Sequence, residues 1–190
     1  MPLPDSSTLR RALSDYPAVV ERQGVAALAG LDRWYRDELP ALIASRGAAH
    51  LTHAELVRLT EWKMARGVWR APNLVLVRGN DPAAVGETST LALAKIPHPT
   101  APVAELSKLR GVGPATASAA VAAAAPHLYP FFDELVAAQL PGLGPVAWTL
   151  GYYARYADAL RSAAGELGGD WTPVLLERAL WAHIGGKAGA

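Results

Sequence analysis

Cysteine is absent from this chain of 190 residues, and its absence excludes several classes of protein. Without thiolates there can be no disulfide, no Cys-ligated zinc site and no Cys-held iron–sulfur cluster. Long hydrophobic runs are also missing, because nowhere do about 18 uncharged apolar residues follow one another. The first residues likewise lack the apolar stretch of a signal peptide. We therefore expect a cytoplasmic, nucleoid-associated protein with no membrane partner.

A strong excess of one charge is missing too, since the formal net charge is only +1. The charges are nevertheless unevenly spread: residues 58–110 hold eight Lys and Arg against four Asp and Glu, whereas residues 1–57 and 111–190 are each net negative. Lys and Arg supply most of the affinity of proteins for nucleic-acid phosphates. The middle third is therefore the predicted nucleic-acid surface.

Most of the chain is rich in Ala and Leu, with apolar residues at i, i+3 and i+4, which is the pattern of helices. We predict an all-α fold, with one compact helical domain over residues 1–184, built as one body or two lobes, and a flexible tail over 185–190. The segment 73–78 would also suit a short strand. The predicted helices span residues 5–14, 16–22, 28–45 with a bend at Pro40, 52–66, 73–78, 82–95, 102–110, 114–124, 133–140, 145–164 and 172–184.

The most specific pattern is a glycine-containing hairpin within residues 106–119. Gly111 and Gly113 permit positive φ angles, and Val112 between them can fill the gap between two helices. The free amides of Gly111, Gly113 and Ala115 would then converge at a helix N-terminus, where they could bind a DNA phosphate. This predicts a helix-hairpin-helix motif that grips a nucleic-acid backbone.

Residues next to the hairpin support a DNA contact. Lys108 and Arg110 flank the turn, and the hydroxyl of Thr116 could add a phosphate contact. A monovalent cation could also bind at the turn. The alternative is an ordinary corner between two helices that binds no ligand.

With these residues the sequence resembles the helix-hairpin-helix DNA glycosylase superfamily, the group that contains endonuclease III, the adenine glycosylase and the inducible 3-methyladenine DNA glycosylase. The resemblance is sharp over residues 102–138, about a fifth of the chain, and diffuse elsewhere. In that superfamily an aspartate begins the next helix a little over twenty residues after the hairpin, where this chain has Asp133. The lyase members carry a Schiff-base lysine at the position of Ala115.

This resemblance implies a monofunctional base-excision repair enzyme, which hydrolyses the N-glycosidic bond of a damaged or modified base without nicking the strand. The missing cysteines set the chain apart from the cluster-bearing branches, and no cofactor and no metal is expected. A carboxylate near the sugar would stabilise its developing positive charge and orient water. Asp133 is the predicted catalytic residue and Glu134 the fallback, while the alternative is that Asp133 only caps a helix.

A basic segment that also contains tryptophan, residues 58–78, is the second predicted DNA surface, because cations can pair with phosphates while indoles stack on bases. Its predicted phosphate contacts are Lys63, Arg66 and Arg70. Trp62 is expected in the core, whereas Trp69 is predicted, with Tyr129 and Glu134, to line a base pocket. Tyr152, Tyr153 and Tyr156 form with Trp148 a predicted packing stripe, and the alternative is that one of these rings forms a wall of the base pocket.

The expected partner is duplex DNA with a flipped base, bound by a monomer. One alternative is a non-catalytic DNA-binding protein that uses the hairpin for backbone contact. Another is a protein–protein adaptor, which would show no salt-dependent DNA binding.

Overall fold

Helices and their connecting turns make up residues 3–189, which are the residues described by this computed structural model, and none of them forms a strand. The predicted all-α fold class is confirmed, and residues 73–78 are helical. None of the helices in residues 3–189 has the length and apolar character needed to cross a bilayer. The helices are α1 Ser6–Arg22, α2 Leu28–Arg33, the π-helix η1 Trp34–Glu38, α3 Leu39–Ala44, α4 His53–Arg66, α5 Ala71–Arg78, α6 Pro82–Leu93, α7 Ala101–Leu106, α8 Pro114–Ala124, α9 Glu134–Ala137, α10 Leu150–Leu167, α11 Pro173–His183 and the 3-10 helix η2 Gly186–Ala188.

Side-chain caps fix several helix starts where the sequence predicts them. Thr52 forms a full capping box with Glu55, in which the Thr52 hydroxyl accepts from the Glu55 amide at 3.3 Å and the Glu55 carboxylate accepts from the Thr52 amide at 2.8 Å. Asp81 caps α6 by accepting from the amide of Ala84 at 3.1 Å. These local signals therefore position α4 and α6.

Two prolines act differently from expectation. Pro17 lies inside a continuous α1, where two helices are predicted, because the buried face of α1 packs along α11 and this contact outweighs one lost hydrogen bond. Near Pro40, where a bend is predicted, the chain forms the π-helical turn η1, which ends two residues before Pro40. A proline ring clashes with the carbonyl four residues earlier in a regular helix, and a π turn widens the backbone there.

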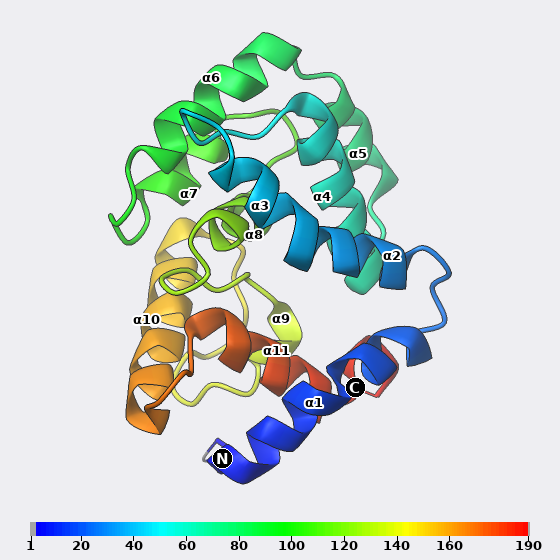
Figure 1. Cartoon of the computed structure of the whole chain (residues 1–190), viewed down its shortest axis with the longest axis vertical. Coiled ribbons are helices and arrows are strands. Elements are labelled where there is room, and N and C mark those ends of the chain that lie inside the picture. Colours follow the sequence, from blue (N-terminus) through cyan, green and yellow to red (C-terminus); the bar gives the residue numbers. More distant parts are fainter. Residues whose placement is uncertain (1–2, 190) are drawn as a thin grey trace.

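The helices form two groups, which Figure 1 shows at opposite ends of the long axis. One group contains α2 to α8, in which α8 packs against α3, α4 and α7. The other contains α1, α9, α10 and α11, and α1 lies along α11. A single cluster of buried apolar side chains, from Leu9 to Ala182, runs through both groups. The amino-terminal helix thus belongs with the carboxyl-terminal ones.

The carboxyl-terminal residues differ from the predicted flexible tail. Gly186 is buried, the amide of Ala188 donates to the side chain of Gln23 at 2.9 Å, and Lys187 donates through Nζ to the Gly67 carbonyl at 3.0 Å. Residue 190 lies outside the described part of the chain. These contacts hold Lys187 at the end of α4.

Candidate active site

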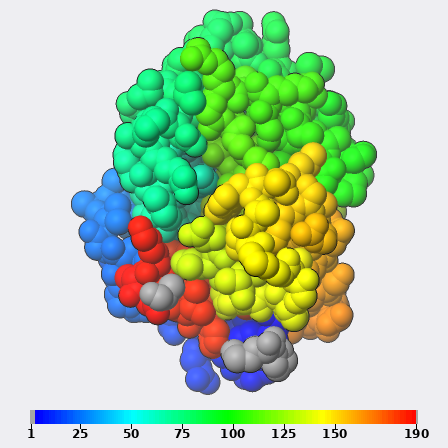
Figure 2. All heavy atoms as spheres, turned by 180° about the vertical axis from the view of Figure 1, so that it is seen from behind, coloured from blue at the N-terminus to red at the C-terminus, as the bar shows by residue number. Residues whose placement is uncertain are grey.

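A pocket opens between the two groups of helices. One wall is the end of α4 with the segment after it, and the other is the approach to α9. Figure 2 shows the surface from this side, where the teal segment after α4, the yellow-green start of α9 and the red carboxyl-terminal residues border one another. The pocket is lined by Lys63, Arg66, Gly67, Val68, Arg70, Phe131, Phe132, Asp133, Glu134, Leu135, Trp148 and Lys187.

Asp133 is held at the pocket wall by backbone contacts on both sides. The Phe132 amide donates to the Ser118 hydroxyl of α8 at 2.9 Å, which ties the strand-like approach to α8. Asp133 then caps α9, because its Oδ1 accepts from the Leu135 amide at 2.9 Å. The residue is 9% exposed. Asp133 therefore caps α9, as the structural alternative predicted, and also lines the pocket.

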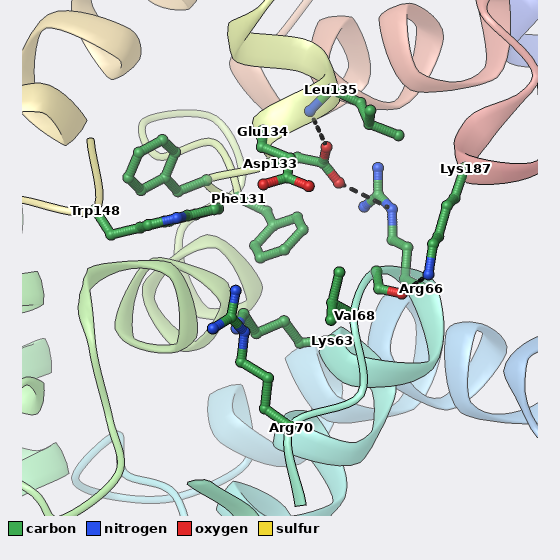
Figure 3. A pocket seen from close by; sticks show the side chains of 12 residues that line it. Lys63, Arg66, Val68, Arg70, Phe131, Asp133, Glu134, Leu135, Trp148 and Lys187 are labelled. Atoms are coloured by element: carbon green, nitrogen blue, oxygen red, sulfur yellow. Dashed lines mark hydrogen bonds and ion pairs between the residues drawn. The ribbon is translucent and has the colours of Figure 1, made fainter. Parts of the chain in front are cut away.

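Arg66 lies behind Asp133 and is only 2% exposed. Its Nη2 pairs with the Glu177 carboxylate, and its guanidinium lies 4.5 Å from the Trp181 ring centroid. Its Nε lies 3.6 Å from Asp133 Oδ2 (Figure 3). The prediction that Arg66 binds a DNA phosphate is wrong, because a buried guanidinium cannot reach one. Arg66 follows Trp62 by four residues, so it shares the inward face of α4.

The Arg66–Glu177 pair is incompletely satisfied. Arg66 Nε and Nη1 and Glu177 Oε2 are buried without a hydrogen-bond partner. Burial raises the pKa of Glu177 above its ordinary value, and Asp133 adds to the rise, although Arg66 and Arg36 act in the opposite direction. Arg66 therefore has spare hydrogen-bonding capacity on the side of Asp133.

Two further predicted DNA cations, Lys63 and Arg70, reach the pocket from α4 and the segment after it (Figure 3). Arg70 is exposed, while Lys63 is half-buried. Burial lowers the pKa of Lys63, Arg70 lowers it further, and Asp133 and Glu134 act against this. Lys63 and both carboxylates therefore belong to one electrostatic cluster.

Aromatic rings form the rest of the wall. Trp148 is 44% exposed and lines the pocket, and its ring centroid lies 4.9 Å from that of Phe132, which also packs against the three buried tyrosines of the predicted stripe. The four rings thus pack around Phe132, and one of them, Trp148, also lines the pocket.

The two rings predicted outright for a base pocket, Trp69 and Tyr129, do not line this one. Trp69 is 56% exposed and does not line the pocket, although its neighbours Val68 and Arg70 do. Tyr129 is buried and donates to the His98 carbonyl at 2.8 Å, so its placement in a base pocket is wrong.

The sequence predictions do not assign Trp148, Lys187 or Glu177 to the site. Trp148 follows a Gly- and Pro-rich turn and precedes the cap Thr149, and this position outside the helix was the available clue. Lys187 of η2 lines the pocket and binds the Gly67 carbonyl, and Glu177 of α11 pairs with Arg66; both residues are distant from α4 in the sequence. Trp62 is fully buried as predicted, with its ring centroid 3.6 Å from that of Tyr35.

The turn between α7 and α8 places its two glycines in different environments. Gly111 has φ 75°, and a Cβ there would lie 2.7 Å from the Asn73 carbonyl oxygen. Gly113 is exposed with φ −96°, and a Cβ there would meet nothing within 4 Å. Glycine is thus required at 111 and not at 113, where the φ angle is one that any residue can adopt. Val112 is buried, as predicted for a plug.

The residues around this turn divide into exposed and buried sets. Lys108 and Arg110 are exposed, although Lys108 pairs with Glu105 at 2.8 Å. Ala115 and Thr116 are 6% and 4% exposed, so the predicted phosphate contact of the Thr116 hydroxyl is wrong. None of these residues lines the pocket. The turn is linked to the pocket through α8, whose Ser118 binds Phe132, and through α5, which contacts Gly111 and begins directly after Arg70.

The pocket combines two carboxylates, Asp133 and Glu134, with aromatic walls and a rim of cations. Residues 3–189 contain no cluster of three or more His, Cys, Asp or Glu side chains arranged to hold a metal. No protein-family model, no curated protein and no solved structure matches the chain. Its function is therefore argued from the geometry of this pocket and from the residues that form it.

Proposed function

We propose that this protein is a DNA base-excision glycosylase, which hydrolyses the N-glycosidic bond of a damaged or modified base. The observation that carries the proposal is the position of Asp133, a carboxylate fixed by a backbone amide at the wall of an aromatic pocket between two groups of helices. The resemblance of residues 102–138 to the helix-hairpin-helix glycosylases supports the same residue. A flipped base would enter beside Phe132 and Trp148.

The chemistry would depend on charge. As the base leaves, positive charge develops on the sugar, and a carboxylate close by stabilises it and can orient the attacking water. In this chain Asp133 would have that role, and Arg66 and the Leu135 amide would hold its carboxylate in one orientation. Glu134, which is exposed and lines the same pocket, remains the second candidate.

The DNA backbone would follow the exposed cations and the turn before α8. Arg70 at the pocket rim and Lys108 and Arg110 beside the turn can each neutralise a phosphate. The amides of Gly111 and Gly113 can contribute to an anion site at the start of α8. Trp69 could stack on a base next to the extruded one, since it is exposed beside the rim.

The test is an assay on duplexes that carry single alkylated, deaminated or oxidised bases, heated in alkali to reveal abasic sites. We expect cleavage with the wild-type protein and a loss of at least about 100-fold in Asp133→Asn, with DNA affinity retained. Asp158→Asn is the matched control, because Asp158 is an exposed aspartate outside the pocket and pairs with Arg161. Glu134→Gln decides between the two carboxylates.

A second candidate is a DNA-binding protein without catalysis, and the exposed cations beside the turn favour it specifically. It predicts salt-dependent binding of undamaged duplex and no abasic product from any lesion. Absence of both binding and cleavage would overturn both candidates. In Lys108→Ala and Arg110→Ala we expect weaker binding to all sequences and a smaller salt slope.

A further inference from the structure

The amine of Lys63 lines the pocket and has no role in the proposed hydrolysis. Lys63 comes from the last turn of α4 and lines the pocket together with Asp133 and Glu134. In Figure 3 no hydrogen bond or ion pair joins Lys63 to another pocket residue, whereas Lys187 donates to the Gly67 carbonyl. Lys63 is thus an amine inside the pocket without a structural task among the residues drawn.

We propose that Lys63 is an amine nucleophile, which forms an imine with the aldehyde of an abasic deoxyribose and thereby cleaves the strand. This inference rests on the proposed function, because base removal would leave that aldehyde in this pocket. It adds a lyase step that the sequence does not predict, since Ala115 occupies the position where the lyase relatives carry their lysine. The amine comes instead from a different helix.

The environment of Lys63 suits a nucleophile. A lysine attacks a carbonyl only as the neutral amine, and desolvation or a neighbouring cation favours that form. Burial and the neighbouring Arg70 both lower the pKa of Lys63. Lys187, the other pocket lysine, is exposed, and its Nζ is engaged by a backbone carbonyl. The two pocket lysines therefore differ in both burial and hydrogen bonding.

The proposed step balances without a redox partner. The Lys63 nitrogen attacks C1′ of the ring-opened sugar, a C–N bond forms, and water leaves to give the protonated imine. A carboxylate of the pair Asp133 and Glu134 accepts the C2′ proton, the C2′–C3′ double bond forms, and the C3′–O bond breaks with departure of the 3′ phosphate. Water then hydrolyses the imine, which releases the unsaturated aldehyde and regenerates the amine.

The test uses the full chain and a duplex with a pre-formed abasic site, so that it does not require base removal by this protein. Sodium borohydride reduces the imine to a stable amine, and the protein–DNA adduct is measured by its shift on a denaturing gel. We expect an adduct with the wild type, with Lys63 as the modified residue by peptide mass spectrometry. In Lys63→Arg, which keeps the charge, we expect at least about 100-fold less adduct.

Two comparisons make the result specific. Lys95→Arg should trap like the wild type, because Lys95 lies outside the pocket and pairs with Glu105. A duplex with a tetrahydrofuran site, which has no aldehyde, should bind to Lys63→Arg and to the wild type equally and give no adduct. Equal binding would show that the substitution removes chemistry and leaves the fold intact.

The outcomes separate this inference from the proposed function. No adduct, or an adduct on Lys187 or any other amine, overturns the role of Lys63 even if damaged bases are released. An adduct on Lys63 without base release from any lesion supports the lyase step and overturns the glycosylase proposal. Release of bases together with an adduct on Lys63 supports both.

Discussion

Two aspartates in the interior of this protein face an arginine, and they differ in how completely their oxygens are bound. Asp32, on α2, accepts from the Tyr16 hydroxyl and from Trp62 Nε1, both at 2.8 Å, and pairs with Arg36 at 3.1 Å. Burial alone would raise the pKa of Asp32, but Arg36 and the Trp62 hydrogen bond outweigh it and hold that pKa below its usual range. Asp32 is a carboxylate with all its partners inside the protein.

The carboxylate of Asp133 accepts fewer hydrogen bonds than that of Asp32. Its side chain accepts one backbone hydrogen bond, and its arginine, Arg66, lies 3.6 Å away, beyond good hydrogen-bonding distance. Both aspartates line a cavity, Asp32 with Arg36 and Asp133 with Trp148, so the two differ in the number of hydrogen bonds that their oxygens accept. The difference teaches that a fully bound buried carboxylate stabilises the fold, whereas a partly bound one at a cavity retains oxygens for a ligand.

The largest expected loss of stability comes from removing one partner of the buried Arg66–Glu177 pair. Arg66→Ala leaves a buried carboxylate without its partner, which typically costs about 3–5 kcal/mol of unfolding free energy. We expect a loss in that range by urea denaturation. The double variant Arg66→Met with Glu177→Leu should recover most of it, since apolar replacement of a buried pair is often neutral. A single variant within about 0.5 kcal/mol of wild type would contradict the burial of the pair.

The next effect compares the two aspartates directly. Asp32→Asn removes the charge that Arg36 pairs with, so we expect a loss of about 3 kcal/mol in unfolding free energy. Asp133→Asn should lose less than about 1 kcal/mol, because Asn caps a helix about as well as Asp. Urea denaturation of both variants checks the difference. Equal losses would mean that Asp133 is as structural as Asp32 and would weaken its catalytic assignment.

A smaller difference in unfolding free energy is expected between variants of two buried tyrosines, one bound to Asp32 and the other to the segment that leads to Asp133. The Tyr16 hydroxyl donates to the charged Asp32, and the Tyr156 hydroxyl donates to the Phe131 carbonyl at 2.7 Å. Hydrogen bonds to charged groups contribute about 1.5–3 kcal/mol and neutral ones about 1 kcal/mol. Tyr16→Phe should therefore destabilise more than Tyr156→Phe in thermal and urea denaturation. The reverse order would contradict the assignment of Asp32 as the fully bound carboxylate.

Local signals predicted most of the fold. Thr52, Asp81 and Thr172 each begin a helix as caps, and the turn at Gly111 lies between two helices as expected. These features depend on neighbours within a few residues, which a sequence displays directly. Helix continuation through Pro17 was missed because it depends on α11, which is distant in the sequence.

The site was predicted only in part, for a related reason. Asp133, Glu134, Lys63 and Arg70 do line one pocket, because each is adjacent to a helix end that local pattern identifies. Arg66 and Lys63 look alike in sequence, but Arg66 is buried and pairs with Glu177 of the distant helix α11, whereas Lys63 is half-buried and lines the pocket. Which face of a helix is buried depends on partners that no short pattern specifies.

Acid should weaken the Asp32 cluster in a defined direction. Because the pKa of Asp32 is lowered in the folded state, its stabilising contribution is present above its unfolded value of about 3.9 and is lost as the pH falls through the folded pKa. The difference in unfolding free energy between wild type and Asp32→Asn should be constant from pH 7 to about pH 5 and shrink below about pH 4. Urea denaturation at each pH measures it, and effects of other titrating groups cancel in the difference. A difference that stays constant down to about pH 3 would show that the partners of Asp32 do not favour its charged form. The contrast between the fully bound Asp32 and the partly bound Asp133 would then have no electrostatic basis.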